Sequence, residues 1–111
     1  MKRLHIVVTM DPEQLNHVFK ALADPTRRRI IDQLRDRPGQ SLFELCAGAV
    51  ADGLPVLSRQ AVTQHLDILE RAGLVRVEWA GRTKLHALEL EPLREAATLW
   101  LGQYLEEGDD R

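Results

Sequence analysis

Apolar residues recur at helical spacing through the first third of the chain. Asp11-Pro12 is followed by four of them at positions i, i+3, i+4 and i+7: Leu15, Val18, Phe19 and Leu22. An acidic N-cap with proline in the first turn is a typical helix start. Asp24-Pro25 repeats this signal, and Pro38-Gly39 ends the pattern that follows it. The sequence therefore predicts two consecutive helices before residue 38.

Two further helices are predicted between residues 41 and 73. Ser41 and Glu44 have the spacing of a capping box. The helix that they open carries one apolar stripe: Leu42, Leu45, Cys46, Ala49 and Val50. Residues 52–55, Asp-Gly-Leu-Pro, interrupt this stripe. Ser58 is the expected N-cap of a fourth helix that runs to Ala72 and is stopped by Gly73.

The fourth predicted helix has an unusual polar face. At about 100° per residue, Val62, Leu66 and Leu69 share one side of it. Side chains that donate and accept hydrogen bonds lie on the rest of the surface: Arg59, Gln60, Thr63, Gln64 and Asp67. A helix that only has to be soluble typically carries a mixture of Lys and Glu instead. Hydrogen bonding to the edges of DNA bases would give this face a purpose.

After residue 73 the hydrophobic period becomes two, as in a β-strand. Val75, Val77 and Trp79 alternate with charged residues, and residues 80–83 turn the chain into a second strand from Lys84 to Leu90. The sequence thus predicts a β-hairpin with a cationic tip. Helices followed by an exposed polar helix and a hairpin are typical of a winged helix-turn-helix, a mostly α-helical fold with a small β-hairpin.

Pro92 opens a last predicted helix with a long apolar stripe. Its members have helical spacing: Leu93, Ala96, Ala97, Trp100, Leu101 and Tyr104. Because so small a domain struggles to bury this stripe and the N-terminal arm within one chain, we expect it to pack against a second copy in a two-fold dimer. Trp100 and Tyr104 are alternatively candidates for an aromatic ligand pocket between protomers, although we favour the core of a dimer.

Composition places these elements in one domain. The 111 residues have a formal net charge of −2, 44% of them are hydrophobic, and one cysteine excludes an internal disulfide. No cleavable signal or membrane-spanning stretch is evident, so we expect a cytoplasmic protein. We assign residues 1–10 to an extended N-terminal arm, 11–90 to a DNA-binding domain, and 91–111 to a dimerisation helix with an acidic tail.

Charge is distributed unevenly along the chain. Residues 20–37 carry six basic and three acidic side chains, whereas residues 89–111 carry two basic and seven acidic ones. This polarity suits a polyanion bound by the middle of the chain. Arg27, Arg28 and Arg29 are candidates for phosphate contacts, but three consecutive helical residues span about 200° and cannot all face one partner. We expect a single contact, from Arg27.

Two segments resemble the ArsR/SmtB family of bacterial repressors. They are residues 21–28, Ala-Leu-Ala-Asp-Pro-Thr-Arg-Arg, and residues 58–75, from Ser-Arg-Gln-Ala-Val-Thr-Gln-His-Leu to Leu-Glu-Arg-Ala-Gly-Leu-Val. The resemblance implies a homodimer that binds a palindromic operator in double-stranded DNA and represses transcription. The residues that it places against DNA are Ser58, Arg59, Gln60, Thr63 and Gln64, with Arg82 and Lys84 on the wing. The first and last helices would form the dimer interface, which comprises Leu15, Phe19, Leu93, Ala97, Trp100, Leu101 and Tyr104.

The chain also departs from the family pattern. Metal sensors of the family often carry Glu-Leu-Cys-x-Cys, but here Cys46 is followed two residues later by Gly48. One thiolate cannot hold a thiophilic metal, and no histidine follows His86, so we expect neither metal sensing nor a cofactor. Cys46 is interpreted as a small buried hydrophobe rather than a redox switch. His65 is either a packed residue or lies near the DNA backbone.

The segment before the fourth helix is about six residues longer than is usual in the family. The enlarged turn at residues 47–57 could lengthen the third helix, form a small-molecule lip or be a plain loop, and we favour the loop. Whether an inducer exists does not follow from the sequence.

The preferred function is therefore a dimeric winged-helix repressor. A protein-binding winged helix is the alternative, although it would favour an apolar rather than a polar fourth helix. An enzyme is not supported, because the sequence contains no paired-carboxylate site, glycine-rich phosphate loop or nucleophilic triad.

Overall fold

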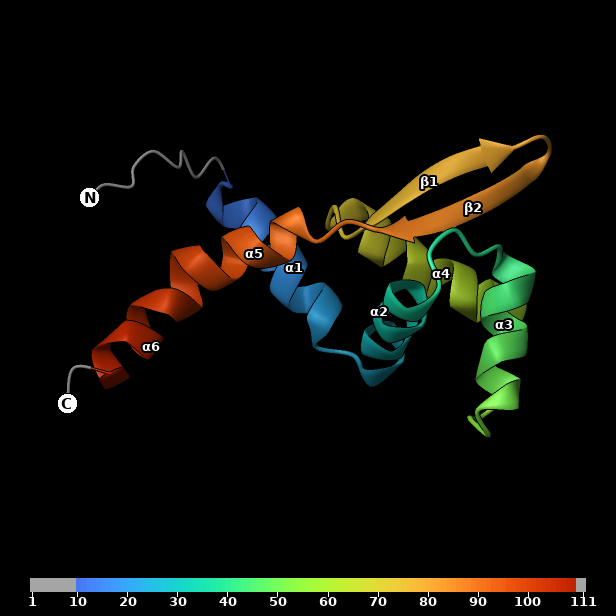
Figure 1. The fold of residues 1–111 in the computed structure, drawn as a ribbon, viewed down its shortest axis with the longest axis horizontal. Helices are drawn as coiled ribbons and strands as arrows, with labels where there is room; N and C mark the ends of the chain where they lie inside the picture. Colours follow the sequence, from blue (N-terminus) through green and yellow to red (C-terminus); the bar gives the residue numbers. More distant parts are fainter. Residues whose placement is uncertain (1–9, 110–111) are drawn as a thin grey trace.

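The computed structural model describes residues 10–109, with side chains to residue 105. Helices α1 to α4 precede a two-stranded antiparallel hairpin, and a helical segment follows it (Figure 1). The elements are α1 (Pro12–Leu22), α2 (Pro25–Asp36), α3 (Leu42–Ala51), α4 (Arg59–Arg71), β1 (Val75–Ala80), β2 (Thr83–Leu88), α5 (Glu91–Ala96), η1 (Ala97–Leu101) and α6 (Gly102–Asp109). This order confirms the predicted winged helix-turn-helix. The predicted arm lies almost entirely outside the described residues.

Local capping explains where the four N-terminal helices begin. Asp11 accepts a hydrogen bond from the backbone N–H of Gln14 at 2.8 Å, and Asp24 accepts one from Thr26 at 2.7 Å. Ser41 and Glu44 form the predicted capping box with distances of 3.1 and 2.9 Å. Such caps satisfy backbone donors that the first turn of a helix leaves free. All four predicted starts are confirmed.

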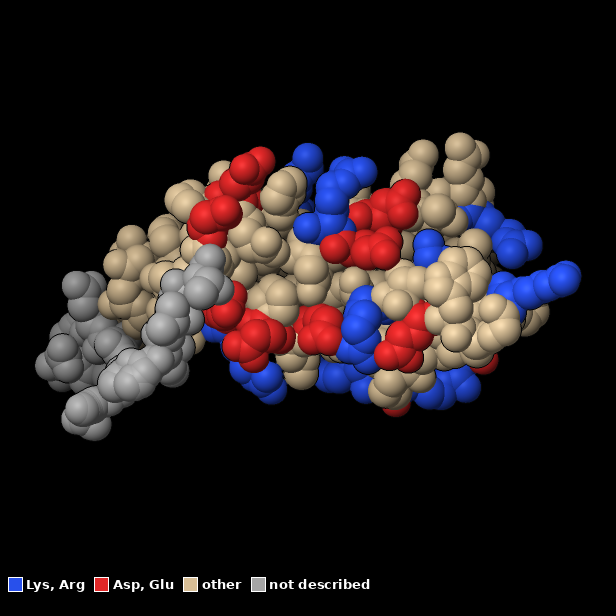
Figure 2. Space-filling model, turned by 90° about the horizontal axis from the view of Figure 1, so that it is seen from above, with Lys and Arg blue, Asp and Glu red and all other residues tan. Residues whose placement is uncertain are grey.

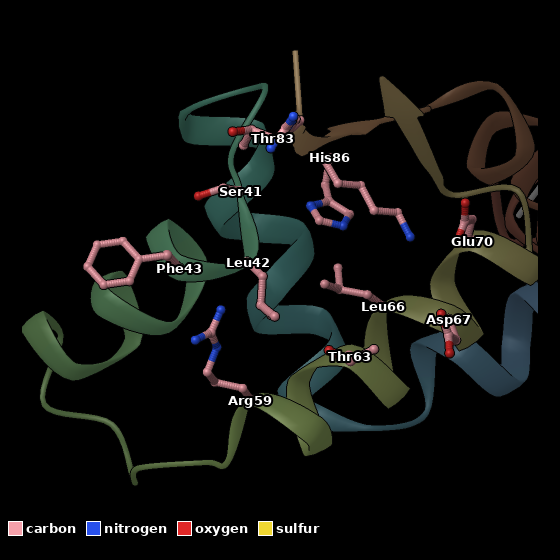
Figure 3. A pocket seen from close by; sticks show the side chains of 12 residues that line it. Ser41, Leu42, Phe43, Arg59, Thr63, Leu66, Asp67, Glu70, Thr83 and His86 are labelled. Atoms are coloured by element: carbon pink, nitrogen blue, oxygen red, sulfur yellow. The ribbon is translucent and has the colours of Figure 1, made fainter. Parts of the chain in front are cut away.

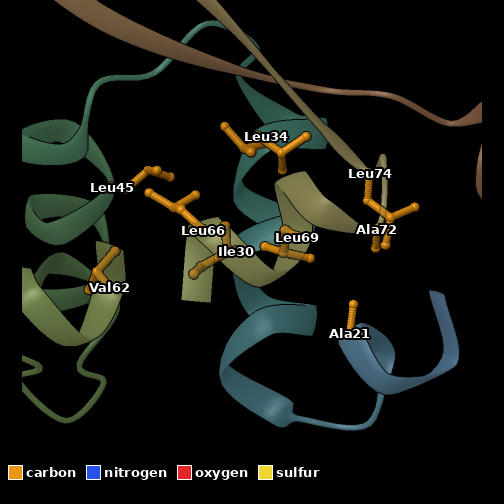
Figure 4. Packing of buried hydrophobic residues seen from close by; sticks show 10 residues of the cluster. Ala21, Ile30, Leu34, Leu45, Val62, Leu66, Leu69, Ala72 and Leu74 are labelled. Atoms are coloured by element: carbon orange, nitrogen blue, oxygen red, sulfur yellow. The ribbon is translucent and has the colours of Figure 1, made fainter. Parts of the chain in front are cut away.

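The core lies between α2, α3 and α4 and extends to the base of the hairpin (Figure 4). The apolar side of α4 is buried there, as predicted. The buried cluster comprises Ala21, Ile30, Leu34, Leu45, Val62, Leu66, Leu69, Ala72, Leu74 and Val75. Burial of one side of α4 leaves its other side facing away from the core.

The base of the hairpin is fastened to the loop between α2 and α3. Gln40 and His86 form an antiparallel bridge in which each backbone N–H donates to the other residue's carbonyl. The His86 ring is buried, with Nδ1 2.9 Å from the Gln40 carbonyl oxygen. At the other end of the hairpin Gly81 has a φ of +63°, which glycine adopts without strain in a two-residue turn. The wing therefore projects from an anchored base.

The C-terminal segment differs from the single α-helix that we predicted. A π-helical turn, η1, separates α5 from α6, and the Gly102 N–H donates to the Ala97 carbonyl five residues earlier. A Cβ on Gly102 would lie 3.2 Å from that carbonyl oxygen, so glycine relieves a close approach there. The wider turn changes which side chains share a face, and Leu99 joins Trp100 and Leu101 at the surface. Figure 1 shows this segment extending away from the hairpin.

Candidate nucleic-acid interface

The polar side of α4 is fully available for contact. All five predicted reading residues are exposed: Ser58, Arg59, Gln60, Thr63 and Gln64. The Ser58 hydroxyl oxygen accepts a hydrogen bond from the Ala61 N–H at 3.0 Å and so caps the helix. The other four side chains are free of hydrogen bonds to the described part of the chain. An exposed helix with unused donors and acceptors has the form of a recognition helix.

A groove of about 500 Å³ runs between α4, the start of α3 and the wing (Figure 3). Arg59 and Thr63 from α4 line it together with Arg82 and Lys84 from the wing. The fold therefore brings together two groups of predicted contacts that are about 20 residues apart in the sequence. Gln60 and Gln64 lie outside this groove on the exposed surface of α4.

Both basic and acidic side chains line the groove. Figure 3 shows Arg59 close to the start of α3, whereas Asp67 and Glu70 lie farther along α4. Seen from above, Lys and Arg side chains lie at the end of the molecule formed by α3 and the wing tip, and others are interspersed with Asp and Glu along its length (Figure 2). Carboxylates repel phosphate, so Asp67 and Glu70 make their part of the groove the less favourable one for an anion.

Several groove residues were missed by the sequence analysis. Ser41, Phe43, Thr83 and His86 line it, and the Phe43 ring is 70% exposed. His86 could have been found from strand alternation, because it pairs with Val77 and shares the inner face of the hairpin with Val75. Phe43 lies outside the apolar stripe that the sequence gives this helix, but nothing in the sequence indicated that it borders a groove.

Arg27 corrects one prediction, because its side chain lies in the interior rather than at the DNA surface. Nε donates to the Ala21 carbonyl at 2.9 Å, and Nη2 donates to the Lys20 carbonyl at 3.1 Å. The residue is 9% exposed. A guanidinium that satisfies carbonyls at the end of α1 cannot also reach a phosphate. Arg27 therefore joins α1 to α2 and is structural.

The sequence left two alternatives for His65, a packed residue or one near the DNA backbone, and in the structure it is packed. Its Nδ1 lies 3.1 Å from Nη1 of Arg27, and the ring is half-buried between α2 and α4. Asp24 lies 3.9 Å from the same Arg27 nitrogen. Burial raises the pKa of Asp24, but the backbone N–H groups of Thr26 and Arg27 and the Arg27 charge outweigh it and lower that pKa. This cluster fixes α2 against α4.

Arg76 is an additional wing cation, but it is already paired. Its guanidinium contacts the carboxylates of Glu89 and Glu78, the latter at 3.2 Å. The side-chain hydrogen bond with Glu89, followed by that with Glu78, raises the pKa of Arg76. Arg82 and Lys84 make no ion pair with the described side chains, so these two provide the wing's available positive charge.

The predicted dimer residues form an apolar surface at the other end of the molecule. Phe19 and Trp100 pack edge to face with ring centroids 5.9 Å apart, and the Trp100 and Tyr104 rings are 5.0 Å apart. Leu15, Phe19 and Trp100 line a notch of about 360 Å³. Leu93 is half-buried against the core, whereas Ala97, Trp100, Leu101 and Tyr104 are exposed.

Within the described part of the chain, no group of three or more His, Cys, Asp or Glu residues has an arrangement that could hold a metal ion. Cys46 is a free thiol that is half-buried and packs against the core. Among the described residues, no helix is long and apolar enough to cross a membrane.

Comparison with known proteins agrees with this geometry. Residues 22–78 match the helix-turn-helix domain family. The HTH-type transcriptional regulator YuzN of Bacillus subtilis is 37% identical over 84 residues, which cover 76% of this chain and 91% of YuzN. The transcriptional repressor SdpR of the same organism is 29% identical, with 86% of this chain and 98% of SdpR covered.

A solved structure extends the match to the whole fold. A crystal structure of an ArsR family transcriptional regulator superposes with a TM-score of 0.73 at 33% identity, covering 92% of this chain and 97% of that one. The chain belongs to the ArsR family of helix-turn-helix transcriptional regulators. The resemblance seen in the sequence is thus confirmed. As an ArsR-family regulator the protein binds DNA and is not an enzyme.

Proposed function

We propose that this ArsR-family regulator is a homodimeric repressor that binds a palindromic operator. The observation that carries the proposal is the exposed hydrogen-bonding face of α4 beside the cationic tip of the wing. In this arrangement Gln60, Thr63 and Gln64 read base edges in the major groove, and Arg59, Arg82 and Lys84 contact phosphates. Similarity to the repressor SdpR supports repression as the outcome.

The exposed C-terminal surface supports the dimer. The radius of gyration is 16.2 Å, compared with about 13 Å for a compact chain of this length. The wing and the segment from α5 to α6 both project from the core, and the exposed apolar residues of that segment include Leu99, Trp100, Leu101 and Tyr104. Contiguous apolar surface of this kind marks an interface. Pairing of two copies through α1 and this segment covers it and fills the notch beside Phe19.

In this arrangement different segments of the chain bind DNA and form the dimer. Residues 11–90 bind DNA, and residues 91–111 carry the dimerisation helix and the acidic tail, which keeps DNA away from that end by charge repulsion. A two-fold dimer presents two copies of α4 to half-sites about one helical turn apart. The proposal includes no metal or cofactor and places the protein in the cytoplasm with its DNA.

A salt titration of DNA binding tests the proposal. Fluorescence anisotropy is measured with the DNA upstream of the protein's own gene and with a scrambled fragment of equal length and composition. We expect tight binding to the native fragment, weak binding to the scrambled one, and a fall in both affinities with salt. Equally weak binding to both, even with fragments drawn from the rest of the genome, would contradict sequence-specific repression and favour a protein-binding role for α4.

A further inference from the structure

A second cavity lies behind the DNA face, under the enlarged turn before α4. It has a volume of about 120 Å³ and lies between α2, α3 and the first turn of α4. Its walls are aliphatic and include Ile30, Leu45, Ala49 and Val62. Dry apolar cavities of roughly this size take up molecules the size of benzene. An apolar body of about six carbon atoms is therefore the kind of group that fits it.

The turn that covers this cavity carries apolar side chains that are exposed to solvent. Leu54, Val56 and Leu57 line the cavity, yet Val56 is 80% exposed and Leu57 is 39% exposed. A solvent-facing loop needs no such residues, and a ligand below them would bury part of their surface. The extra residues of the turn thus form a lip over a cavity, which differs from the plain loop that the sequence favoured.

The charges at the rim specify the ligand further. Arg29 from α2 and Arg59 from α4 both line the cavity, and no acidic side chain among the described residues does. Neither guanidinium has an ion-pair partner within 4.0 Å among the described side chains. The apolar body of a ligand with one anionic group would fill the cavity. Its anionic group would accept charge-assisted hydrogen bonds from these arginines.

Arg59 connects the cavity to the DNA groove, because its side chain lines both. An anion that pairs with Arg59 in the cavity neutralises a positive charge that the groove offers to phosphate. The same ligand holds the lip, which leads directly into Ser58, the N-cap of α4. Occupancy of the cavity and binding of DNA therefore compete for one side chain.

We propose that this cavity binds a small apolar anion of the medium-chain carboxylate class, and that its occupancy weakens DNA binding. The binding site stands on the cavity itself, whereas the regulatory effect rests on the proposed function. Because binding and regulation are separate claims, they are tested in separate measurements on the full chain.

The first measurement is isothermal titration calorimetry without DNA, with octanoate, octanol and octylammonium as probes of equal chain length. We expect octanoate to bind about tenfold more tightly than octanol, the effect of one charge-assisted hydrogen bond, and octylammonium to bind least. Arg29→Gln should reduce the advantage of octanoate over octanol, with Arg59 left to pair with the anion. Arg35→Gln, on the exposed side of the same helix, is the matched control and should preserve it.

A second variant tests the lip without disturbing the core. Val56→Asp changes a side chain that is 80% exposed, and it should weaken the binding of octanol as well as octanoate because it places a carboxylate beside the apolar body. Equal wild-type affinities for octanoate and octanol would overturn the site. It would also be overturned if neither Arg29→Gln nor Val56→Asp lowers the affinity for octanoate. Circular dichroism of each variant establishes that the fold is retained.

The second measurement repeats the DNA titration with saturating octanoate. We expect about a tenfold loss of affinity in the wild type and a smaller loss in Arg29→Gln, which binds less octanoate at the same concentration. If calorimetry shows octanoate binding but octanoate does not change the DNA affinity, the binding site is supported and the regulatory effect is overturned. Absence of specific DNA binding before any octanoate is added would instead count against the proposed function, and the calorimetry would still decide the site.

Discussion

Helix α4 and the C-terminal segment from α5 to α6 are both amphipathic in sequence, yet the fold exposes opposite sides of them. In α4 the apolar residues Val62, Leu66 and Leu69 are buried and the polar side faces solvent. Among the side chains of the C-terminal segment that the structure describes, only Ala96 is buried, and Trp100 and Leu101 are more than 40% exposed. The two regions thus offer different chemistry to partners.

This difference indicates what each surface is for. Exposed hydrogen-bonding groups are stable in water, and they can bind a partner with complementary donors and acceptors, such as a base edge. Exposed aromatic and aliphatic groups are unfavourable in water, so their natural partner is another apolar surface. The first surface suits DNA, and the second suits a copy of the same chain.

The largest effect is expected from breaking the apolar surface. Trp100→Glu should separate the proposed dimer, because it replaces a large aromatic group with a charge at the interface, at a cost of about 3–5 kcal/mol of association free energy. Analytical ultracentrifugation should show a monomer, and operator affinity should fall with it. Trp79→Glu, which changes an exposed tryptophan on the wing, is the control and should leave the mass unchanged. A Trp100→Glu protein that stays dimeric would remove this surface from the interface.

A second variant tests whether the stability of the four N-terminal helices depends on hydrogen bonds made by a buried polar side chain. Arg27→Ala should lower the free energy of unfolding by about 2–3 kcal/mol, because it leaves the Ala21 and Lys20 carbonyls without their donor. Urea denaturation measures this loss, with Arg35→Ala on the exposed side of α2 as the control. The salt dependence of DNA binding should not change. A shallower slope with unaltered stability would restore Arg27 as a phosphate contact.

The polar side of α4 is tested by removing one hydrogen-bonding side chain at a time. Gln60→Ala or Thr63→Ala should weaken operator binding by about 1–3 kcal/mol with little change on random DNA. Asp32→Ala alters an exposed polar residue on α2, outside both proposed surfaces, and should have no effect. Anisotropy titrations on both fragments measure the difference. Equal losses on operator and random DNA would reject base reading by these residues.

The smallest effect is expected at the wing. Arg82→Ala should weaken binding on every sequence by less than about 1 kcal/mol and should lower the salt slope by about 0.9, the value for one phosphate contact. Arg76→Ala is the matched control on the same hairpin, because Glu89 and Glu78 already pair that guanidinium. If Arg82→Ala and Arg76→Ala give the same slope, the wing tip does not contact phosphate.

Most of the fold could be predicted from the sequence because its signals are local. The N-caps Asp11, Asp24, Ser41 and Ser58 act within three residues, and each starts a helix where predicted. Gly73 stops α4 with a φ of +80°, and the Leu74 and Gly73 N–H groups close the helix end. The exposed face of α4 also followed from helical periodicity alone.

The errors came from contacts that the spacing of apolar residues does not report. Arg27 was expected at the surface, but carbonyls at the end of α1 and the ring of His65 draw its side chain inward. The π-helical turn at η1 was missed because an i to i+5 hydrogen bond leaves no pattern in apolar spacing. Arg59 gave no sign in the sequence that it borders two cavities at once.

The sequence by itself therefore determined the helices, the hairpin and which side of α4 is polar, since caps and periodicity are properties of neighbouring residues. Only the tertiary structure decided which side chains are free to act. Packing buried Arg27 and His86, placed Arg59 and Thr63 beside the wing, and left a cavity under the turn before α4. Burial depends on how helices far apart in the chain fit together, and the spacing of residues within one helix does not fix that fit.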